Sequence, residues 1–494
     1  MKKFVWLLVF LIPLLLLYSP VLASSDTDDL RRMLEELRKE VETLKKENAE
    51  LRSQVEELKK AQIPAAAPVV APSKHSFYSK GGYGSTPSGI DFYGFFKIDA
   101  VWQDSSAVGD IYVLYVLPDS KGGGDNKFTL NFRHSRFGFD FSKPYKTWNL
   151  FGKMEMDFYT ECHNEETLPW NANHSPLRAR RVFVGVEKGT WQLLAGLDWL
   201  TISQLYPHTS NFPAGTFMGN PAYRMPQVRL TKWFKINDVS QLKFQIAAEK
   251  PYGFPPMNGI VWDEDPANDA GFPGIEARIA YETKLFGKPA LAAVWGHYSE
   301  EEYATQYGDK DAESYSIGLE AKFPLPIQKK AFLLGEIWYG RNFDGYYSCG
   351  VNQGTRFTVY FDDGTTQQTK YVTDLRDSTL KKVFENFDPD TNKYQVLSVD
   401  EIDAWGGWIE LELFWTPKLV THFGWGIDNP DNDDLAGVSG ARLQQQMFYT
   451  NFLYRLTKEF GFGMEYMYVR TDYRQSDGGD GKLNRFMGSF YYFF

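Results

Sequence analysis

The sequence predicts an all-β transmembrane barrel of sixteen antiparallel strands, preceded by an N-terminal α-helical coiled coil. Three observations predict this fold class. Apolar and polar residues alternate from residue 90 onward in segments of about ten residues, as in strands that cross a membrane in a closed barrel. Short and long connections alternate between these segments. Aromatic residues make up 16% of the 494 residues, although the average composition is polar.

The first 23 residues form a predicted secretory signal peptide. Lys2 and Lys3 precede an apolar core over residues 4–17, and Val21-Leu22-Ala23 places small residues before a cut at Ser24. The alternative is an uncleaved signal anchor. The formal net charge is −10 for the whole chain and becomes −12 when the two lysines are removed with the signal. A chain this acidic is a poor candidate for binding nucleic acid.

A heptad repeat occupies residues 26–61 and predicts a coiled coil. Leucine fills every d position, and a polar residue at one a position is expected to fix the register. The residues expected to mediate oligomerisation are Leu37, Leu44, Asn48, Leu51 and Leu58. Residues 62–89 are rich in Pro, Ala and Gly, which predicts an extended linker.

The rest of the chain, residues 90–494, is predicted to form the barrel. In its first strand Phe96 and Ile98 alternate with Lys97 and Asp99, and the same two-residue period recurs in sixteen segments. The predicted strands are 90–103, 128–141, 147–160, 177–188, 190–200, 226–235, 240–249, 274–284, 288–299, 313–323, 329–341, 402–415, 418–428, 441–455, 459–471 and 483–494.

The connections between strands fall into two classes. Those from even-numbered to odd-numbered strands are short, such as Lys188-Gly189 and Phe286-Gly287, and the others are long and polar. Periplasmic turns and extracellular loops of outer-membrane barrels differ in this way, whereas a soluble sandwich has no reason to segregate its connections. Tryptophans near strand ends fit the aromatic girdles of such barrels: Trp102, Trp148, Trp191, Trp199, Trp233, Trp415 and Trp425.

The start of the barrel segment carries a family resemblance, and its end carries a signal found in outer-membrane barrels generally. It opens with Asp91-Phe92-Tyr93-Gly94-Phe95-Phe96-Lys97-Ile98-Asp99-Ala100. It ends with Phe490, Tyr492 and Phe494 at alternate positions, which resembles the C-terminal strand signal read by the barrel assembly machinery. With the signal peptide, the coiled coil and the Pro/Ala spacer, this architecture resembles the DcaP-like outer-membrane porins over the whole mature chain.

The resemblance implies a homotrimer of sixteen-stranded barrels in the bacterial outer membrane, with the coiled coil in the periplasm. It also implies passage of small, often anionic, organic solutes. The expected partners are outer-membrane lipid and lipopolysaccharide, the barrel assembly machinery and small-molecule solutes, with no nucleic acid and no cofactor. The Asn48 pattern alone favours a two-stranded coil, so the trimer rests on the resemblance.

Charged residues on the lumen side of the strands are the candidates for solute selectivity, because charged side chains in a pore set its ion preference. A charged residue is expected to point into the lumen when it alternates with apolar residues of the same strand. In the second strand, a predicted bulge turns two arginines inward. The predicted pore-lining residues are Lys97, Arg133, Arg136, Glu155, Asp157, Arg181 and Arg229.

Two further expectations concern charge on the walls of the pore. Glu155 and Asp157 are expected to oppose the basic residues across the lumen. Arg178 and Arg180 share the parity of the outward-facing valines, and they are therefore expected to face lipopolysaccharide phosphates or a neighbouring subunit.

The third long connection, Thr201 to Met225, is the predicted constriction loop. It carries few charges, which suits packing inside a barrel. Its candidate functional residues are Tyr206, His208, Tyr223 and Arg224. The alternative is a loop that lies on the outer surface.

Other candidate sites are weaker. Cys162 and Cys349 fall in long loops on the same side, and they form either a disulfide or two free thiols. Residues 388–392 resemble the start of a calcium loop but lack its later Gly and Glu. The acidic residues 428–434 are expected to form a solvated loop. The seven histidines are dispersed along the chain, and no metal site is predicted.

These features predict a porin rather than an enzyme. The sequence contains no G-x-S-x-G elbow, no H-E-x-x-H motif and no P-loop. The expected function is passive diffusion of small hydrophilic solutes, anionic organic ones above all. The alternatives are a sugar-specific porin with aromatic residues in the lumen, a structural barrel that tethers the outer membrane to the cell wall, and a lipase-type barrel.

Overall fold

The computed structural model describes most of the chain from residue 89 onward. The described residues are 89–109, 113–118, 125–159, 175–211, 218–251, 266–305, 307–327, 330–346, 351–362, 367–373, 383–384, 394–474 and 479–494. The predicted signal peptide, the coiled coil, the linker up to residue 88, the calcium-like segment 388–392, Cys162 and Cys349 lie outside them. Within the described ranges, no helix is both long and apolar enough to cross a membrane.

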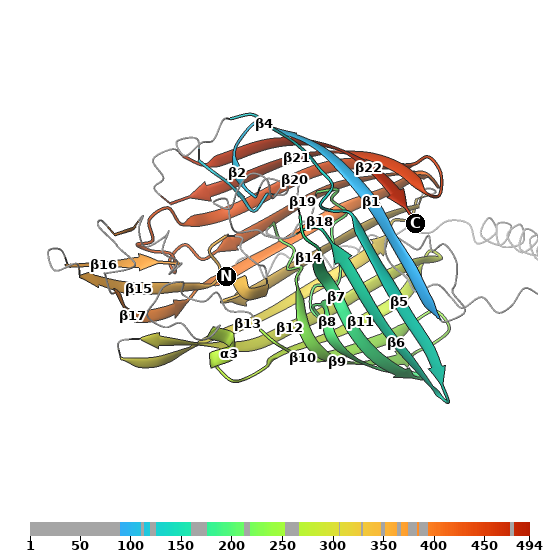
Figure 1. The fold of residues 1–494 in the computed structure, drawn as a ribbon, viewed down its shortest axis with the longest axis horizontal. Coiled ribbons are helices and arrows are strands. Elements are labelled where there is room, and N and C mark those ends of the chain that lie inside the picture. The colour runs from blue at the N-terminus through green and yellow to red at the C-terminus, as the bar shows by residue number, and fades with distance from the viewer. Residues whose placement is uncertain are drawn as a thin grey trace, which may run out of the picture. The chain divides into compact units, whose positions relative to one another are not determined.

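A closed antiparallel sheet forms the barrel (Figure 1). Of the seventeen strands described in this sheet, β4 and β5 both pair with one edge of β1 and together fill one place, so the ring has sixteen places. The other edge of β1 pairs with β22, from Phe95 opposite Phe493 to Gln103 opposite Arg485, and this pairing closes the ring. The predicted sixteen-stranded barrel is therefore confirmed.

The strands follow one another round the ring in chain order. They are β1 (Ile90–Gln103), β4 (Lys127–Asn131) with β5 (Arg136–Tyr145), β6 (Trp148–Asp157), β7 (Arg178–Lys188), β8 (Trp191–Trp199), β9 (Arg224–Lys235), β10 (Gln241–Glu249), β11 (Gly274–Leu285), β12 (Lys288–Thr305), β13 (Gly308–Pro324), β14 (Lys330–Arg341), β18 (Asp403–Thr416), β19 (Leu419–Pro430), β20 (Arg442–Arg455), β21 (Phe460–Tyr473) and β22 (Gly481–Phe493).

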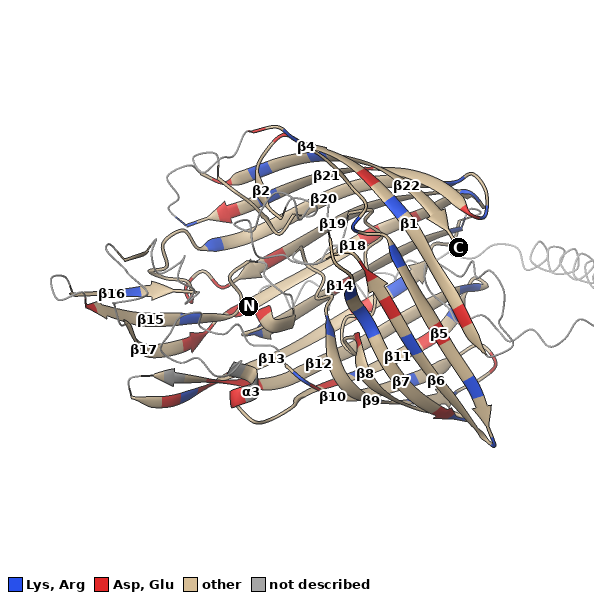
Figure 2. Ribbon diagram, viewed as in Figure 1, with Lys and Arg blue, Asp and Glu red and all other residues tan. Residues whose placement is uncertain are grey.

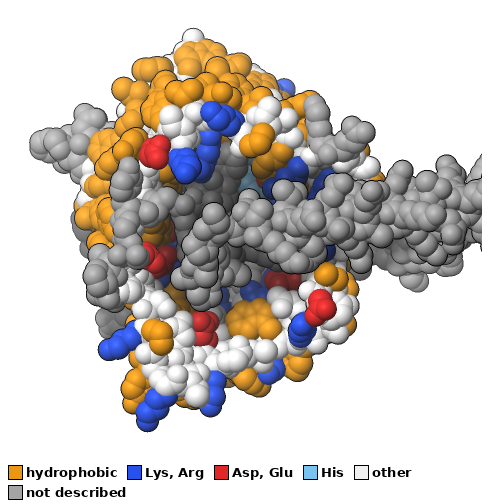
Figure 3. All heavy atoms as spheres, turned by 90° about the vertical axis from the view of Figure 1, so that its right-hand side faces the viewer, with side chains coloured by type: hydrophobic (Ala, Val, Ile, Leu, Met, Phe, Trp, Pro, Cys, Tyr) orange, Lys and Arg blue, Asp and Glu red, His pale blue; other side chains and the backbone are white. Residues whose placement is uncertain are grey.

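Side chains alternate between the outside and the interior of the barrel, because a strand turns successive residues to opposite faces. In β1, Phe96 and Ile98 are 53% and 41% exposed, whereas Lys97 and Asp99 are 0% and 3% exposed. Figure 3 looks onto one end of the barrel, where hydrophobic side chains cover much of the outer surface and charged side chains lie round a central hollow. An apolar outside and a polar interior are typical of barrels that cross a membrane.

The short connections lie at one end of the barrel (Figure 1). Between β11 and β12, Phe286 and Gly287 have φ angles of 51° and 70°. Two successive positive φ angles form the turn type whose twist matches that of paired strands. This explains why a two-residue connection is sufficient here.

One predicted long loop is instead a hairpin. Strands β12 and β13 continue beyond their predicted ends and remain paired as far as Thr305 and Gly308. The prediction of a long polar loop over residues 300–312 is therefore wrong. The strands continue because Tyr303 and Ala312 bury their side chains against a second sheet.

That second sheet lies in the connection between β14 and β18, where the sequence pattern predicts only a long polar loop. β15 (Thr355–Asp362) pairs with β16 (Gln367–Val372) on one edge and with β17 (Tyr394–Glu401) on the other. Phe357 of β15 packs edge-on against Tyr303 of the β12–β13 hairpin, with ring centroids 5.2 Å apart. The remaining described elements are β2 (Ala107–Val108), β3 (Tyr115–Val116), α3 (Pro266–Asp269) and the 3-10 helix η4 (Asp344–Tyr346).

The second barrel strand is interrupted where the sequence predicts a bulge. Asn131 lies opposite Asp99 and Arg136 opposite Phe95, so residues 132–135 stand against the shorter segment 96–98 of β1. The Ser135 hydroxyl accepts a hydrogen bond from the Lys97 N–H at 3.0 Å and donates one to the Lys97 carbonyl at 3.2 Å. This side chain replaces the ladder partner that the extra residue removes.

Replacing Ser135 by Ala is expected to lower the free energy of unfolding by about 1–3 kcal/mol, because two buried backbone groups of Lys97 lose their partner. Urea titration of the detergent-solubilised barrel, followed by the gel mobility of the folded form, measures the loss. The matched control is Ser142→Ala, since Ser142 is exposed and bonds only to the Asn149 side chain among the contacts described for its hydroxyl. Equal losses in the two variants would contradict the assigned role of Ser135.

Candidate functional site

An inner loop, defined here as the described residues 200–211 and 218–223, lies inside the barrel. Its backbone N–H groups donate to buried carboxylates of the interior wall: Thr201 to Glu276 (2.5 Å), Leu205 to Glu320 (2.9 Å), His208 to Glu410 (2.6 Å), Ser210 to Glu465 (2.6 Å) and Gly219 to Asp428 (3.0 Å). These acceptors belong to β11, β13, β18, β21 and β19. The described part of the loop therefore follows the interior wall from β11 round to β21.

The inner loop is also anchored through its carbonyl groups. Lys97 of β1 donates from Nζ to the Ser210 carbonyl at 2.9 Å, and Asn451 of β20 donates to the His208 carbonyl at 2.7 Å. The charge-assisted bond from Lys97 contributes roughly 1.5–3 kcal/mol, and the neutral bond from Asn451 roughly 0.5–1.5 kcal/mol. The loop is thus held by several such contacts spread along its length.

One stretch of the inner loop lies directly against two strands. A Cβ atom on Gly426 of β19 would lie 1.9 Å from the Met218 carbonyl oxygen, and one on Gly219 would lie 2.0 Å from the Gly407 carbonyl oxygen of β18. Gly219 also has a φ angle of +98°, which only glycine adopts readily. Side chains are therefore excluded where the loop backbone touches the wall.

Two predicted loop residues lie in the part of the loop that follows the wall. The Tyr206 ring packs on Trp199, with centroids 5.1 Å apart. Nδ1 of His208 lies 2.6 Å from Glu410 Oε1. Burial alone would lower the pKa of His208, but the charge of Glu410, the hydrogen bond to it and the charge of Glu412 together outweigh burial and raise that pKa above its usual value.

The other two predicted residues lie at the end of the loop. Tyr223 packs against a buried cluster that includes Trp295 and Phe343. Arg224 is the first residue of β9, and its guanidinium group lies 4.6 Å from the centroid of the Trp199 ring. Trp199 therefore lies in the interior, and its predicted place in an interfacial girdle is wrong.

A bulge in β7 turns successive arginines to the interior. Glu155 of β6 faces Arg181, but Met156 faces Ala179, so Arg180 is an extra residue in the ladder. A bulge of one residue reverses which side chains point inward beyond it. The outward orientation predicted for Arg178 and Arg180 is therefore wrong, because the valines from which parity was read lie on the other side of the bulge.

Both arginines pair with acids of the neighbouring strand. Arg180 is fully buried, with Nε 3.1 Å from Glu155 and Nη1 2.7 Å from Asp157. Nη2 of Arg178 lies 2.9 Å from Asp157. Since β6 lies between β5 and β7 (Figure 2), these two acids lie among the arginines, and the prediction that they oppose the basic wall is wrong.

Five arginines gather on this side of the interior, and we call them the arginine cluster: Arg133, Arg136, Arg178, Arg180 and Arg224. Each guanidinium carbon lies 4.6–5.7 Å from the centroid of an aromatic ring of Tyr159, Phe95 or Trp199. The carboxylates that pair with them among the described residues are Glu155 and Asp157. Among the described residues, these five cations and two anions leave an excess of three positive charges.

The remaining predicted pore residues are paired. Lys97 Nζ lies 2.7 Å from Asp99, in addition to its bond with the inner loop. Arg181 and Arg229 share one carboxylate, Asp198, at 2.6 Å and 2.7 Å. These pairs add little net charge beside the arginine cluster.

The last residues of the chain lie at the closure of the barrel. Phe490 and Tyr492 are exposed on the outer face of β22. The Phe494 carbonyl accepts a hydrogen bond from the Gly94 N–H at 2.9 Å, and the Phe494 ring stacks on Phe92 at 5.2 Å. These contacts join the end of the chain to the first strand.

The carboxylates that hold the inner loop were not predicted as functional residues. Glu320, Glu410 and Glu465 each interrupt an apolar strand at an inward position, which is the only signal the sequence carries for them. Asp428 was predicted to belong to a solvated acidic loop. It is fully buried at the end of β19, because it accepts the Gly219 N–H.

The barrel resembles solved outer-membrane channels. The outer membrane channel DcaP of Acinetobacter baumannii is similar over 84% of this chain and 99% of its own, with 20% sequence identity and a TM-score of 0.59. An anion-selective porin from Comamonas acidovorans (9% identity, 82% and 99% covered) and OmpF of Salmonella typhi in complex with daunomycin (14% identity, 83% and 99% covered) both have TM-scores of 0.47. The chain shares the fold of the first, which confirms the resemblance at the level of the fold.

Sequence comparisons give no further identification. No protein-family model and no curated protein sequence matches the chain.

Proposed function

We propose that this chain is an outer-membrane porin for small hydrophilic solutes, with a preference for organic anions. The observation that carries the proposal is the position of the arginine cluster. The described inner loop covers the interior wall from β11 to β21, whereas the arginines lie on β5, β7, β9 and the β4–β5 junction. A solute that passes the loop meets this basic part of the wall.

The two signs of charge in the interior have different roles in this proposal. The wall carboxylates that bind the inner loop, such as Glu320 and Glu410, are at most 2% exposed and already accept backbone hydrogen bonds. The side chains of Arg136 and Arg178 are 18% and 25% exposed. These two guanidinium groups are partly accessible from the pore, and their positive charge favours the approach of an anion.

The same proposal includes cellular placement and assembly. The apolar outer face belongs in lipid, and the short turns belong in the periplasm, as in other outer-membrane barrels. The coiled coil over residues 26–61 would then lie in the periplasm and join three chains. We further propose lipopolysaccharide as a contact of the outer leaflet, and Phe490, Tyr492 and Phe494 as the strand signal for the assembly machinery.

Swelling of proteoliposomes tests the proposed function. A small dicarboxylate is expected to enter faster than an uncharged sugar of similar size. Replacing both Arg136 and Arg178 by Gln is expected to slow dicarboxylate entry about threefold to tenfold, as a loss of about 1 kcal/mol of favourable charge interaction implies. Entry of the sugar should not change.

The control variant is Arg356→Gln, which removes an arginine of β15 outside the barrel sheet that pairs with Asp400 at 3.3 Å. It should leave both rates unchanged. A barrel that admits no solute would support the structural-tether alternative. Faster entry of sugar than of dicarboxylate would support the sugar-specific alternative.

A further inference from the structure

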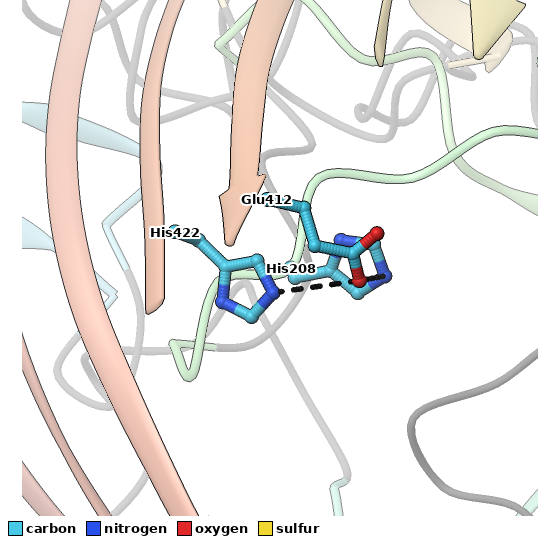
Figure 4. Close-up of side chains that lie close together, drawn as sticks. All are labelled: His208, Glu412 and His422. Atoms are coloured by element: carbon cyan, nitrogen blue, oxygen red, sulfur yellow. Dashed lines mark ion pairs between the residues drawn. The ribbon is translucent and has the colours of Figure 1, made fainter. Parts of the chain in front are cut away.

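Two histidines and one glutamate converge where the inner loop meets the wall (Figure 4). His208 comes from the loop, Glu412 from β18 and His422 from β19. Nε2 of His208 lies 3.9 Å from Glu412 Oε1, and Nε2 of His422 lies 3.8 Å from the same oxygen. One ligand atom from each of the three residues lies within 4.8 Å of the others.

The second nitrogen of each histidine is held by another side chain. Nδ1 of His208 lies 2.6 Å from Glu410 Oε1, and Nδ1 of His422 lies 2.7 Å from Asn451 Oδ1. A partner on one ring nitrogen fixes the orientation of the imidazole and directs the other nitrogen to a metal ion. Both Nε2 atoms are in this way aimed at the same carboxylate oxygen.

The charges around the three residues also favour a cation. Glu410 and Glu412 contribute two carboxylates, and the permanent cation described next to them is Lys322, whose Nζ lies 2.9 Å from Glu412 Oε2. The Tyr449 hydroxyl donates to Glu410 and adds no charge. A divalent ion between the imidazoles would therefore meet a negative surrounding.

We propose that His208, Glu412 and His422 bind a divalent first-row transition metal, of which Zn²⁺ is the probe. Two imidazoles and one carboxylate suit this class of metal, whereas Ca²⁺ and Mg²⁺ prefer oxygen ligands alone. Zinc bonds of about 2.0–2.1 Å need ligand atoms about 3.3 Å apart, so the side chains must close by a fraction of an ångström to about 1.5 Å. His208 is 25% exposed, which leaves a side open for entry and for a water ligand.

The proposed metal joins the inner loop to the wall, because one ligand belongs to the loop and two belong to adjacent strands. Metal binding should therefore hold the loop in place and reduce the current through the pore. This second consequence rests on the proposed porin function, whereas metal binding itself does not.

Cobalt and zinc titrations of the detergent-solubilised full-length protein test the site. Co²⁺ is expected to develop the strong visible absorption of a site with fewer than six ligands, and Zn²⁺ should abolish it. His422→Gln and Glu412→Gln should each weaken Zn²⁺ affinity by about 100-fold or more, since loss of even an outer partner costs roughly 10–100-fold. Circular dichroism and gel mobility verify that each variant is folded.

The matched control is His297→Gln. His297 is another buried histidine of the interior, on β12, and its two ring nitrogens lie 2.5 Å and 3.0 Å from the hydroxyls of Ser316 and Ser314. This variant should bind Co²⁺ and Zn²⁺ like the unaltered chain. Absent Co²⁺ absorption, full affinity in His422→Gln, or equal competition by Ca²⁺ would overturn the proposal.

Single-channel recording separates the metal site from the porin function. Zn²⁺ should lower the conductance of the unaltered chain and of His297→Gln, and it should not affect His422→Gln. A chain that conducts no current refutes the proposed function, and the Co²⁺ absorption still decides the metal site. Conductance that is insensitive to Zn²⁺ in a chain that binds Co²⁺ overturns the proposed link between the metal and the loop.

Discussion

Replacing Arg180 by Met is expected to lower the free energy of unfolding of the barrel by about 3–5 kcal/mol. Arg180 is fully buried and bonds to Glu155 and Asp157 at 3.1 Å and 2.7 Å. Removing the guanidinium group leaves two carboxylates at the β6–β7 junction with fewer compensating charges. Urea titration of the folded barrel in detergent measures the loss.

Arg178→Gln is the matched control for this prediction. Arg178 contacts the same Asp157, at 2.9 Å, but its side chain is 25% exposed. Its loss should cost about 1 kcal/mol or less, because water replaces part of the interaction. Equal losses for Arg178→Gln and Arg180→Met would contradict the larger contribution to stability assigned to Arg180.

Replacing Gly426 by Ala is expected to release part of the inner loop and to widen the pore. The new Cβ would lie 1.9 Å from the Met218 carbonyl oxygen, and the wall is held by strand pairing on both sides. The loop must therefore move. The contacts at risk are the Gly219 N–H bond to Asp428 and the Trp338 bond to the Gly219 carbonyl, both 3.0 Å long. Together they stabilise the loop by about 3 kcal/mol.

The expected result is a higher single-channel conductance and entry of larger sugars in liposome swelling. Gly488→Ala is the matched control, because a Cβ at this position of β22 would meet no atom within 4 Å. It should leave conductance and the size limit unchanged. If Gly426→Ala folds and conducts like the unaltered chain, the inner loop does not limit the pore.

The strands could be predicted because a barrel wall has an apolar outside and a polar inside. Phe96 and Ile98 against Lys97 and Asp99 show this contrast within a few residues of β1. Where a strand leaves the membrane the contrast no longer applies. The continuation of β12 to Thr305 depends instead on the packing of Tyr303 against Phe357, which lies more than fifty residues further along the chain.

The site was harder to predict because it depends on which residues face each other across strands. The alternation of apolar and polar residues correctly predicted that Lys97 and Arg181 point into the barrel. The single extra residue at Arg180 reverses this alternation, so the prediction failed for Arg178. Nothing in the order of the residues marks that bulge. A bulge was predicted in the second strand, because apolar residues on both sides of it reveal the change of parity.

The histidines illustrate the same limit. His208 and His422 are more than two hundred residues apart, and the sequence therefore shows dispersed histidines and no metal site. They meet because the inner loop crosses from β8 to the wall at β18 and β19. This meeting depends on backbone hydrogen bonds from the loop to buried carboxylates, such as the His208 N–H to Glu410.

The reversal potential of single channels in a salt gradient tests the central claim most directly. The arginine cluster has three positive charges in excess of the acids that pair with it among the described residues, and we therefore expect chloride to be favoured over potassium in the unaltered chain. Replacing Arg136 and Arg178 by Gln should shift the reversal potential toward cation preference, and Arg356→Gln should not. The proposed anion preference would be contradicted if the unaltered chain prefers cations and the Arg136→Gln/Arg178→Gln variant has the same reversal potential.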